Sequence, residues 1–228
     1  MSSSPKLVII PDDVDARLFE IGGLTRSVLT LAGLMGEQAR ENTPRSFPIT
    51  APGTNAYFSR VGSLRDQLRV AGWKGKCVGG SELTITPDEA HAIVVASGDE
   101  NTASETATPK TKTRKGRCMN DAASENRGQM HFLSELAVQT RGTVKIAIED
   151  GARWLTWVFL VARAGDKLLM ELSLVGGLAG DRRGAYWLER IILPDVPLDY
   201  ETGINTGTTP RAPAPTPEIV VSVTRKSA

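Results

Sequence analysis

Residues 154–193 read WLTWVFLVARAGDKLLMELSLVGGLAGDRRGAYWLERIIL, and this stretch decides the fold class. Its apolar runs have the length of β-strands and alternate with turns rich in glycine and aspartate. The run at 154–162 also suits a buried helix, but its tryptophan, threonine, valine and phenylalanine residues favour a strand. We therefore predict a meander of antiparallel strands over 144–148, 154–161, 168–174 and 186–193.

The strand predicted at 168–174 alternates in polarity. Leucine or methionine occupies each even position from Leu168 to Leu174, whereas the odd positions are Leu169, Glu171 and Ser173. A period of two places the even side chains on one face of a sheet. Apart from Leu169, we therefore expect this strand to bury one face only.

The N-terminal part predicts a short strand followed by helices. Residues 7–10 are apolar and precede Pro11, as expected for a strand that ends there. Over 14–38 apolar residues recur mostly at intervals of three and four, which indicates an amphipathic helix. The neighbouring glycines predict a break in this helix near Gly22.

A second amphipathic helix is predicted from Tyr57 to Ala71, after a proline-containing surface loop at 42–54. Its arginines, Arg60, Arg65 and Arg69, lie away from the apolar stripe and predict an exposed basic face. Strands are expected at 83–85 and 92–96. Together these elements predict an α+β fold in which N-terminal helices pack on a mostly antiparallel sheet, within one domain over 1–200.

A long insertion separates the two groups of predicted strands. Residues 99–129 contain no valine, leucine, isoleucine or aromatic residue, so we expect this segment to contribute nothing to a core. Connections of this length are usually disordered or functional. A turn or two of helix is predicted at 120–125, and the rest as a flexible loop.

The insertion carries a dense basic cluster. Its cations are Lys110, Lys112, Arg114, Lys115 and Arg117, with threonines between them. A flexible basic segment can neutralise several phosphates of a nucleic acid and become ordered on binding. The alternative interpretation is a solvated, disordered loop.

A second candidate site is the glycine-rich loop at 176–184, which contains Arg182 and Arg183 and precedes Trp187. Glycines allow close approach of the backbone to phosphates, and arginine and aromatic side chains grip and stack on unpaired bases. The spacing matches neither a phosphate-binding P-loop nor a dinucleotide fingerprint. A wide hairpin turn, with Trp187 in the core, is the alternative.

Other catalytic or metal-binding patterns are weak. Asp99 and Glu100 follow a predicted strand and suit a metal-dependent nuclease or hydrolase, but no further acidic pattern accompanies them. The histidines, His91 and His131, and the cysteines, Cys77 and Cys118, lack the spacing of a zinc site. Neither cysteine has a helix start predicted beside it that would activate the thiol. We therefore expect no metal, no cofactor and no assigned catalytic residue.

The composition predicts no general electrostatic attraction to polyanions, because 27 Lys and Arg balance 26 Asp and Glu, for a net charge of +1. Two cysteines suggest reduced thiols in a cytoplasm. The N-terminus lacks the apolar core of a signal peptide, and no apolar run is long enough to span a membrane.

The C-terminal part predicts a Pro/Thr/Gly linker at 201–217 and then a strand-like tag, Ile219–Val223. We expect this tag, within 201–228, to pair with a sheet edge of its own chain or of a partner, including a second copy.

The sequence thus favours a non-enzymatic nucleic-acid-binding subunit that recognises RNA or single-stranded DNA. The alternatives are an assembly component whose insertion and C-terminal tag order on a partner, and a metal-dependent nuclease or hydrolase.

Overall fold

The computed structural model describes residues 7–9, 13–140, 154–178, 180–182 and 185–198. The chain divides into two units, Met1–Leu198 and Asp199–Ala228, and the fold below is that of the first. The strand predicted at 144–148, the linker at 201–217 and the tag Ile219–Val223 lie outside the described residues.

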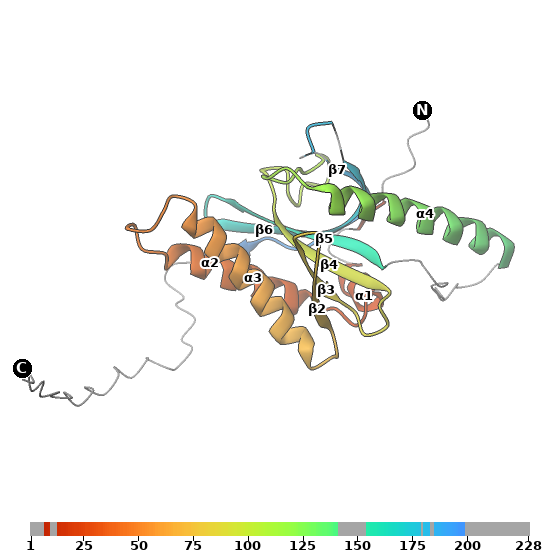
Figure 1. The fold of residues 1–228 in the computed structure, drawn as a ribbon, viewed down its shortest axis with the longest axis horizontal. Coiled ribbons are helices and arrows are strands. Elements are labelled where there is room, and N and C mark those ends of the chain that lie inside the picture. The colour runs from red at the N-terminus through yellow and green to blue at the C-terminus, as the bar shows by residue number, and fades with distance from the viewer. Residues whose placement is uncertain (1–6, 10–12, 141–153, 179, 183–184, 199–228) are drawn as a thin grey trace, which may run out of the picture. The chain divides into compact units, whose positions relative to one another are not determined.

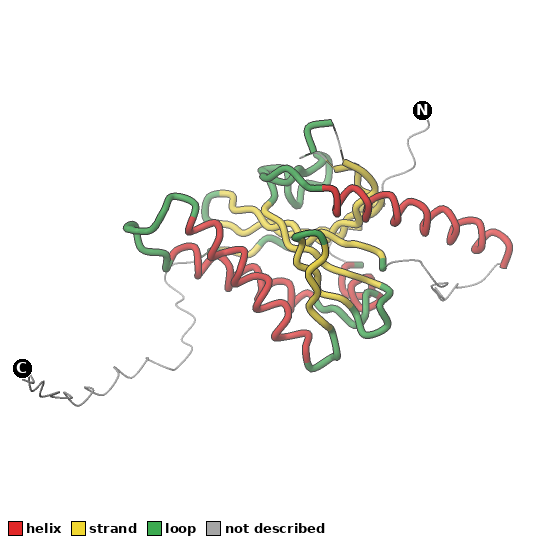
Figure 2. Tube along the Cα trace, viewed as in Figure 1, coloured by secondary structure: helices red, strands yellow, loops and turns green. Residues whose placement is uncertain are grey.

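The fold is α+β, as predicted, with a mixed and mostly antiparallel sheet (Figures 1 and 2). The helices are α1 (Val14–Glu20), α2 (Arg26–Glu41), α3 (Ala51–Arg69) and α4 (Arg117–Thr140). The strands are β1 (Leu7–Ile9), β2 (Lys74–Val78), β3 (Ser81–Ile85), β4 (His91–Ser97), β5 (Leu155–Ala164), β6 (Lys167–Leu178), β7 (Ala185–Ile192) and β8 (Val196–Pro197).

The strand order is β1-β7-β6-β5-β4-β3-β2, and β8 pairs with β6 beside this path. The predicted meander is confirmed for β5, β6 and β7, which pair antiparallel in sequence order. The pairs β4–β5 and β1–β7 are parallel. A parallel pair needs a crossover connection, and the insertion between β4 and β5, which contains α4, supplies it.

Both faces of the sheet are covered, because α1, α2 and α3 lie on one face and α4 lies on the other (Figure 1). The prediction that β6 buries one face only is therefore wrong. Glu171 and Ser173 are fully buried on the face that the insertion covers. Hydrogen bonds within the protein, rather than contacts with solvent, satisfy the polar groups of these two side chains.

The insertion also contributes to the core, contrary to prediction. Helix α4 is much longer than the predicted turn at 120–125, and it buries Met119, Ala122 and Ala123 against the sheet. These residues are small or unbranched, so composition alone gave little sign of a core-facing helix. Close packing of a helix on a sheet does not require large side chains at every contact.

The predicted break in the first helix is confirmed, and it separates α1 from α2. Gly22 and Gly23 have φ angles of 63° and 75°, in the left-handed region that glycine adopts without strain. Thr25 then caps α2, and its hydroxyl accepts a hydrogen bond from the Val28 N–H at 3.4 Å.

Helix α3 begins earlier than predicted, at Ala51, with a proline in its first turn. The predicted exposed position of Arg60 is wrong, because only 2% of this residue is exposed. Its guanidinium lies 3.5 Å from the Glu37 carboxylate of α2. Gly36 of α2 leaves the space that the Arg60 stem fills.

Gly36 therefore offers a test of the α2–α3 contact. A Cβ at this position would overlap the Arg60 side chain and lie 2.9 Å from the Ala56 carbonyl oxygen. We expect Gly36→Ala to lower the free energy of unfolding by about 1–3 kcal/mol. Gly62→Ala on α3 is the control: a Cβ there meets nothing within 4 Å, so we expect a gain of about 0.5–1 kcal/mol. Denaturant unfolding measures both, and equal effects would contradict the packing argument.

Strand β2 was not predicted. Its sequence, KGKCV, lacks apolar alternation, and four of its five residues are exposed. It forms because the turn at Gly79–Gly80, with φ angles of 54° and 77°, folds it back onto β3.

None of the helices in the described part of the chain is both long and apolar enough to cross a membrane.

Candidate nucleic-acid interface

After leaving β4, the insertion turns back and pairs with the end of the same strand. Gly98 and Thr111 form an antiparallel bridge, and the Asp99 N–H donates to the Lys110 carbonyl oxygen at 2.9 Å. The Lys112 N–H donates to Ser97 at the same distance. The first two cations of the basic cluster therefore have fixed backbone positions beside the end of β4.

The base of the insertion is also attached to β7. The Trp187 indole N–H donates to the Pro109 carbonyl oxygen at 3.1 Å, and Trp187 is 1% exposed. The prediction that Trp187 contacts a base is therefore wrong, because a buried ring has no free face for stacking. Its role is to hold the backbone just before Lys110.

The two basic segments predicted separately lie side by side. The Lys115 N–H donates to the Arg182 carbonyl oxygen at 2.9 Å, which joins the insertion to the loop between β6 and β7. Lys110 Nζ lies 3.8 Å from the Asp181 carboxylate in the same loop. Arg183 lies outside the described residues. A surface with cations from both segments therefore forms at the start of α4.

Arg182 has a φ of 57°, which is uncommon for a residue other than glycine. Left-handed backbone at such a residue carries some strain and must be held by its surroundings. The hydrogen bond from Lys115 to its carbonyl is one such restraint. The exposed Arg182 thus lies in a turn that the insertion restrains.

An open hollow of about 370 Å³ lies between these segments. Its cations are Lys115, Arg117 and Arg182, and the other lining residues are Gly116, Asn120, Leu178 and Gly180. The first N–H groups of a helix also attract anions, and α4 begins here at Arg117. The hollow can therefore hold a phosphate-sized anion among three positive side chains.

The cations of this surface differ in their surroundings. Burial lowers the pKa of Lys115, which is half-buried and forms no ion pair with a described residue. Arg117 is 94% exposed and lies 3.7 Å from the Asp121 carboxylate. Lys112 and Arg114 are exposed. We name Lys110, Lys112, Arg114, Lys115, Arg117 and Arg182 the basic surface.

The carboxylate of Asp99 has a local structural role. Its Oδ1 accepts hydrogen bonds from the backbone N–H groups of Asn101 at 3.2 Å and Lys110 at 3.0 Å. This turn positions the insertion against β4. Within the described ranges, no group of three or more His, Cys, Asp and Glu side chains has the geometry of a metal site.

The residues considered above as zinc ligands differ in their surroundings. The buried His91 imidazole accepts a hydrogen bond from the Trp157 indole N–H at 3.2 Å, and burial lowers the His91 pKa to about 4. Cys77 is exposed on β2. The side chain of His131 lies outside the described residues.

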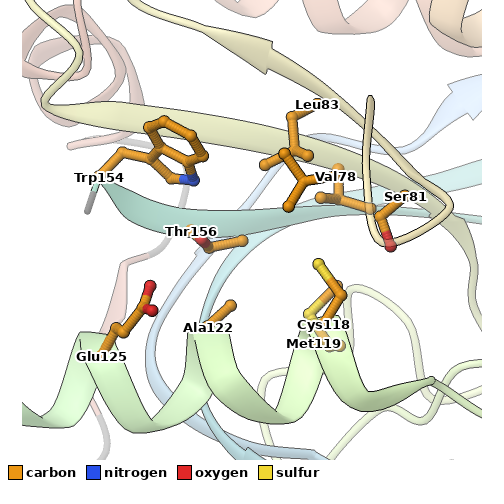
Figure 3. A pocket seen from close by; sticks show the side chains of 10 residues that line it. Val78, Ser81, Leu83, Cys118, Met119, Ala122, Glu125, Trp154 and Thr156 are labelled. Atoms are coloured by element: carbon orange, nitrogen blue, oxygen red, sulfur yellow. The ribbon is translucent and has the colours of Figure 1, made fainter. Parts of the chain in front are cut away.

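Cys118 corrects one prediction, because it is the second residue of α4 and therefore does lie at a helix start. It lines a cavity between α4 and the sheet, together with Glu125 of α4, Trp154 just before β5 and Thr156 of β5 (Figure 3). The cavity volume is about 20 Å³, enough for a single water molecule and too small for a substrate. The open hollow beside Lys115 is thus the better candidate site.

Asn120, Gly116 and Gly180 were not among the predicted site residues, although they line the hollow. An asparagine in the first turns of a helix that follows a basic segment is a weak signal, because such residues are common near helix starts. Only the position of α4 shows that Asn120 faces the same hollow as Arg182.

Comparisons with protein-family models, with curated proteins and with solved structures find no match to this chain. The functional interpretation therefore depends on the arrangement of its own residues.

Proposed function

We propose that this chain is a nucleic-acid-binding subunit that holds RNA or single-stranded DNA on the basic surface. The observation that carries the proposal is the hydrogen bond from Lys115 to Arg182, which places cations from two distant segments around one hollow. With a net charge of only +1, the chain has no general excess of positive charge. Binding would therefore depend on this local concentration of cations.

The chemistry of the surface favours contacts with phosphates. Lysine and arginine side chains neutralise phosphate oxygens and release counterions, so affinity falls steeply as salt rises. Burial removes solvent that would stabilise the positive charge of Lys115, and a bound phosphate would stabilise this charge instead. With Trp187 buried, the proposed contacts are sequence-independent ones to the backbone of the nucleic acid.

The double variant Lys115→Ala/Arg182→Ala tests the proposal, because it removes one cation from each segment. We expect it to weaken binding of fluorescent oligo(U) and oligo(dT) by about tenfold or more and to reduce the salt slope by about 1 to 2. The control, Arg69→Ala/Lys74→Ala, removes the same charge from exposed sites on α3 and β2. Fluorescence anisotropy over a salt series measures affinity and slope together.

Equal losses in the two variants would show that net charge alone drives binding, and absence of binding by the native chain would overturn the proposed function. The same assay with added Mg²⁺ and a gel readout separates binding from cleavage. Metal-dependent cleavage would favour the nuclease that Asp99 and Glu100 suggested.

A further inference from the structure

The outward face of α2 is apolar and lies on the side of the molecule that the proposed function does not use. Leu31 and Met35 are 41% and 38% exposed, and Leu34 is half-buried beside them. Positions three and four apart share one face of a helix. Phe19 of α1, 70% exposed, extends this face.

All of these residues except Met35 line an open groove of about 690 Å³ between α1 and the N-terminal half of α2. Phe19, Leu31 and Leu34 supply its apolar wall. At its rim, the Arg26 guanidinium binds the Asp15 carboxylate through two hydrogen bonds of 2.9 and 3.1 Å. The Asp15 side chain remains 71% exposed beside this ion pair, so the groove suits an apolar side chain accompanied by a further positive charge near Asp15.

The other end of α2 carries an apolar knob, which we define as Phe47 and Ile49 in the loop between α2 and α3. Phe47 is 53% exposed and Ile49 97% exposed. Two turns fix the loop, since the Phe47 N–H donates to Pro44 at 3.0 Å and the Ala51 N–H donates to Pro48 at 2.8 Å. The loop projects from the far end of the helical hairpin, away from α1 (Figure 1).

We propose that a second copy of this chain docks on α2, with the knob of each copy in the groove of the other. The groove is at the start of α2 and the knob is just beyond its end, so an antiparallel pair of α2 helices matches each knob with a groove. Such a contact is self-complementary about a two-fold axis, as in most homodimers. The axis passes near Gln38, about midway between Leu31 and the knob.

Charge supports the same arrangement. Arg45 precedes the knob and forms no ion pair with any residue that the structure describes. Docking of the knob brings Arg45 toward the exposed Asp15 carboxylate of the partner copy, at the rim of the groove. A second copy docked in this way buries the knob and the groove of both chains at once. The dimer would carry two basic surfaces.

Sedimentation analysis of the full chain over about 1–100 µM tests the proposal. We expect a dimer that Ile49→Asp and Leu31→Asp each convert to monomer, with far-UV circular dichroism unchanged because both sites are exposed. Phe58→Asp is the control: Phe58 is 63% exposed on α3 but lies outside the groove and the knob, so the dimer should persist.

A cross-link tests the position of the axis without disturbing apolar residues. With Cys77 and Cys118 replaced by serine, Gln38→Cys should form a disulfide between copies under mild oxidation, whereas Asp66→Cys, on exposed α3 surface, should not. A chain that stays monomeric at every concentration overturns the proposal. A dimer that survives both aspartate variants, or that fails to cross-link through Gln38→Cys, also overturns it. None of these outcomes depends on nucleic-acid binding.

Discussion

Replacing Glu171 with glutamine is expected to lower the free energy of unfolding by about 3–5 kcal/mol, because the change leaves the buried Arg190 guanidinium without a counter-charge. Both side chains are fully buried. Arg190 donates to both carboxylate oxygens of Glu171, with Nε lying 3.0 Å from Oε1. Thermal or denaturant unfolding monitored by tryptophan fluorescence measures the loss.

The same pair holds the insertion on the sheet. The Ala103 N–H donates to Glu171 at 2.8 Å, and Arg190 donates to the carbonyl oxygens of Ser104 and Ala107 at 2.8 and 3.0 Å. Glu171→Gln should therefore also increase hydrogen exchange over 102–107, ahead of the basic surface. Unchanged exchange there would contradict this role.

Two control variants distinguish the effect of an unpaired buried charge from the effect of removing any charge. Glu171→Leu combined with Arg190→Met should regain only part of the stability, since it removes both charges but leaves the Ala103 N–H and the Ser104 and Ala107 carbonyl oxygens without these partners. The double variant should still exchange faster over 102–107. Lys167→Met should change stability little, because Lys167 pairs with Asp195 at an exposed site.

Asn126→Leu is expected to destabilise the fold by about 3–5 kcal/mol, because three buried backbone groups would lose their partner. The side-chain NH₂ group of Asn126 donates to the backbone carbonyl oxygens of Thr156 and Val175 at 2.9 and 2.7 Å. The side-chain oxygen of Asn126 accepts from the Thr156 backbone N–H at 2.8 Å. Asn126 is fully buried. One side chain of α4 thus completes the hydrogen bonding of β5 and β6 where their ladder ends.

Asn120→Leu on the same helix is the matched control, because Asn120 is exposed. It should leave unfolding almost unchanged. A loss at Asn126 no greater than that at Asn120 would show that α4 is not anchored through this amide. Circular dichroism in a urea series resolves the two cases.

Local sequence determined much of the sheet and the first helices. The strands β5, β6 and β7 followed from apolar runs separated by glycine and aspartate turns, because runs of this length with β-branched and aromatic residues favour strands. The break between α1 and α2 followed from Gly22, whose backbone accepts a positive φ. These features depend on neighbours in the chain, so they are visible in the sequence.

The candidate site was only partly visible. Charge density identified the segment from Lys110 to Arg117, and glycines with arginines identified the loop that contains Arg182. That these two loops meet through Lys115 depends on the path of the insertion back to β4 and on the hairpin of β6 and β7. No local pattern encodes that meeting.

Tertiary structure alone decided which polar side chains are buried. Arg60 is enclosed because Gly36 of another helix makes room for it, and Glu171 is enclosed because a segment far earlier in the chain covers its face of β6. Periodicity reports which residues share a face, whereas burial depends on what the fold places over that face. The sequence determined the strands β5, β6 and β7 and the alternation within β6, and the return of the insertion onto the sheet decided that neither face stays open.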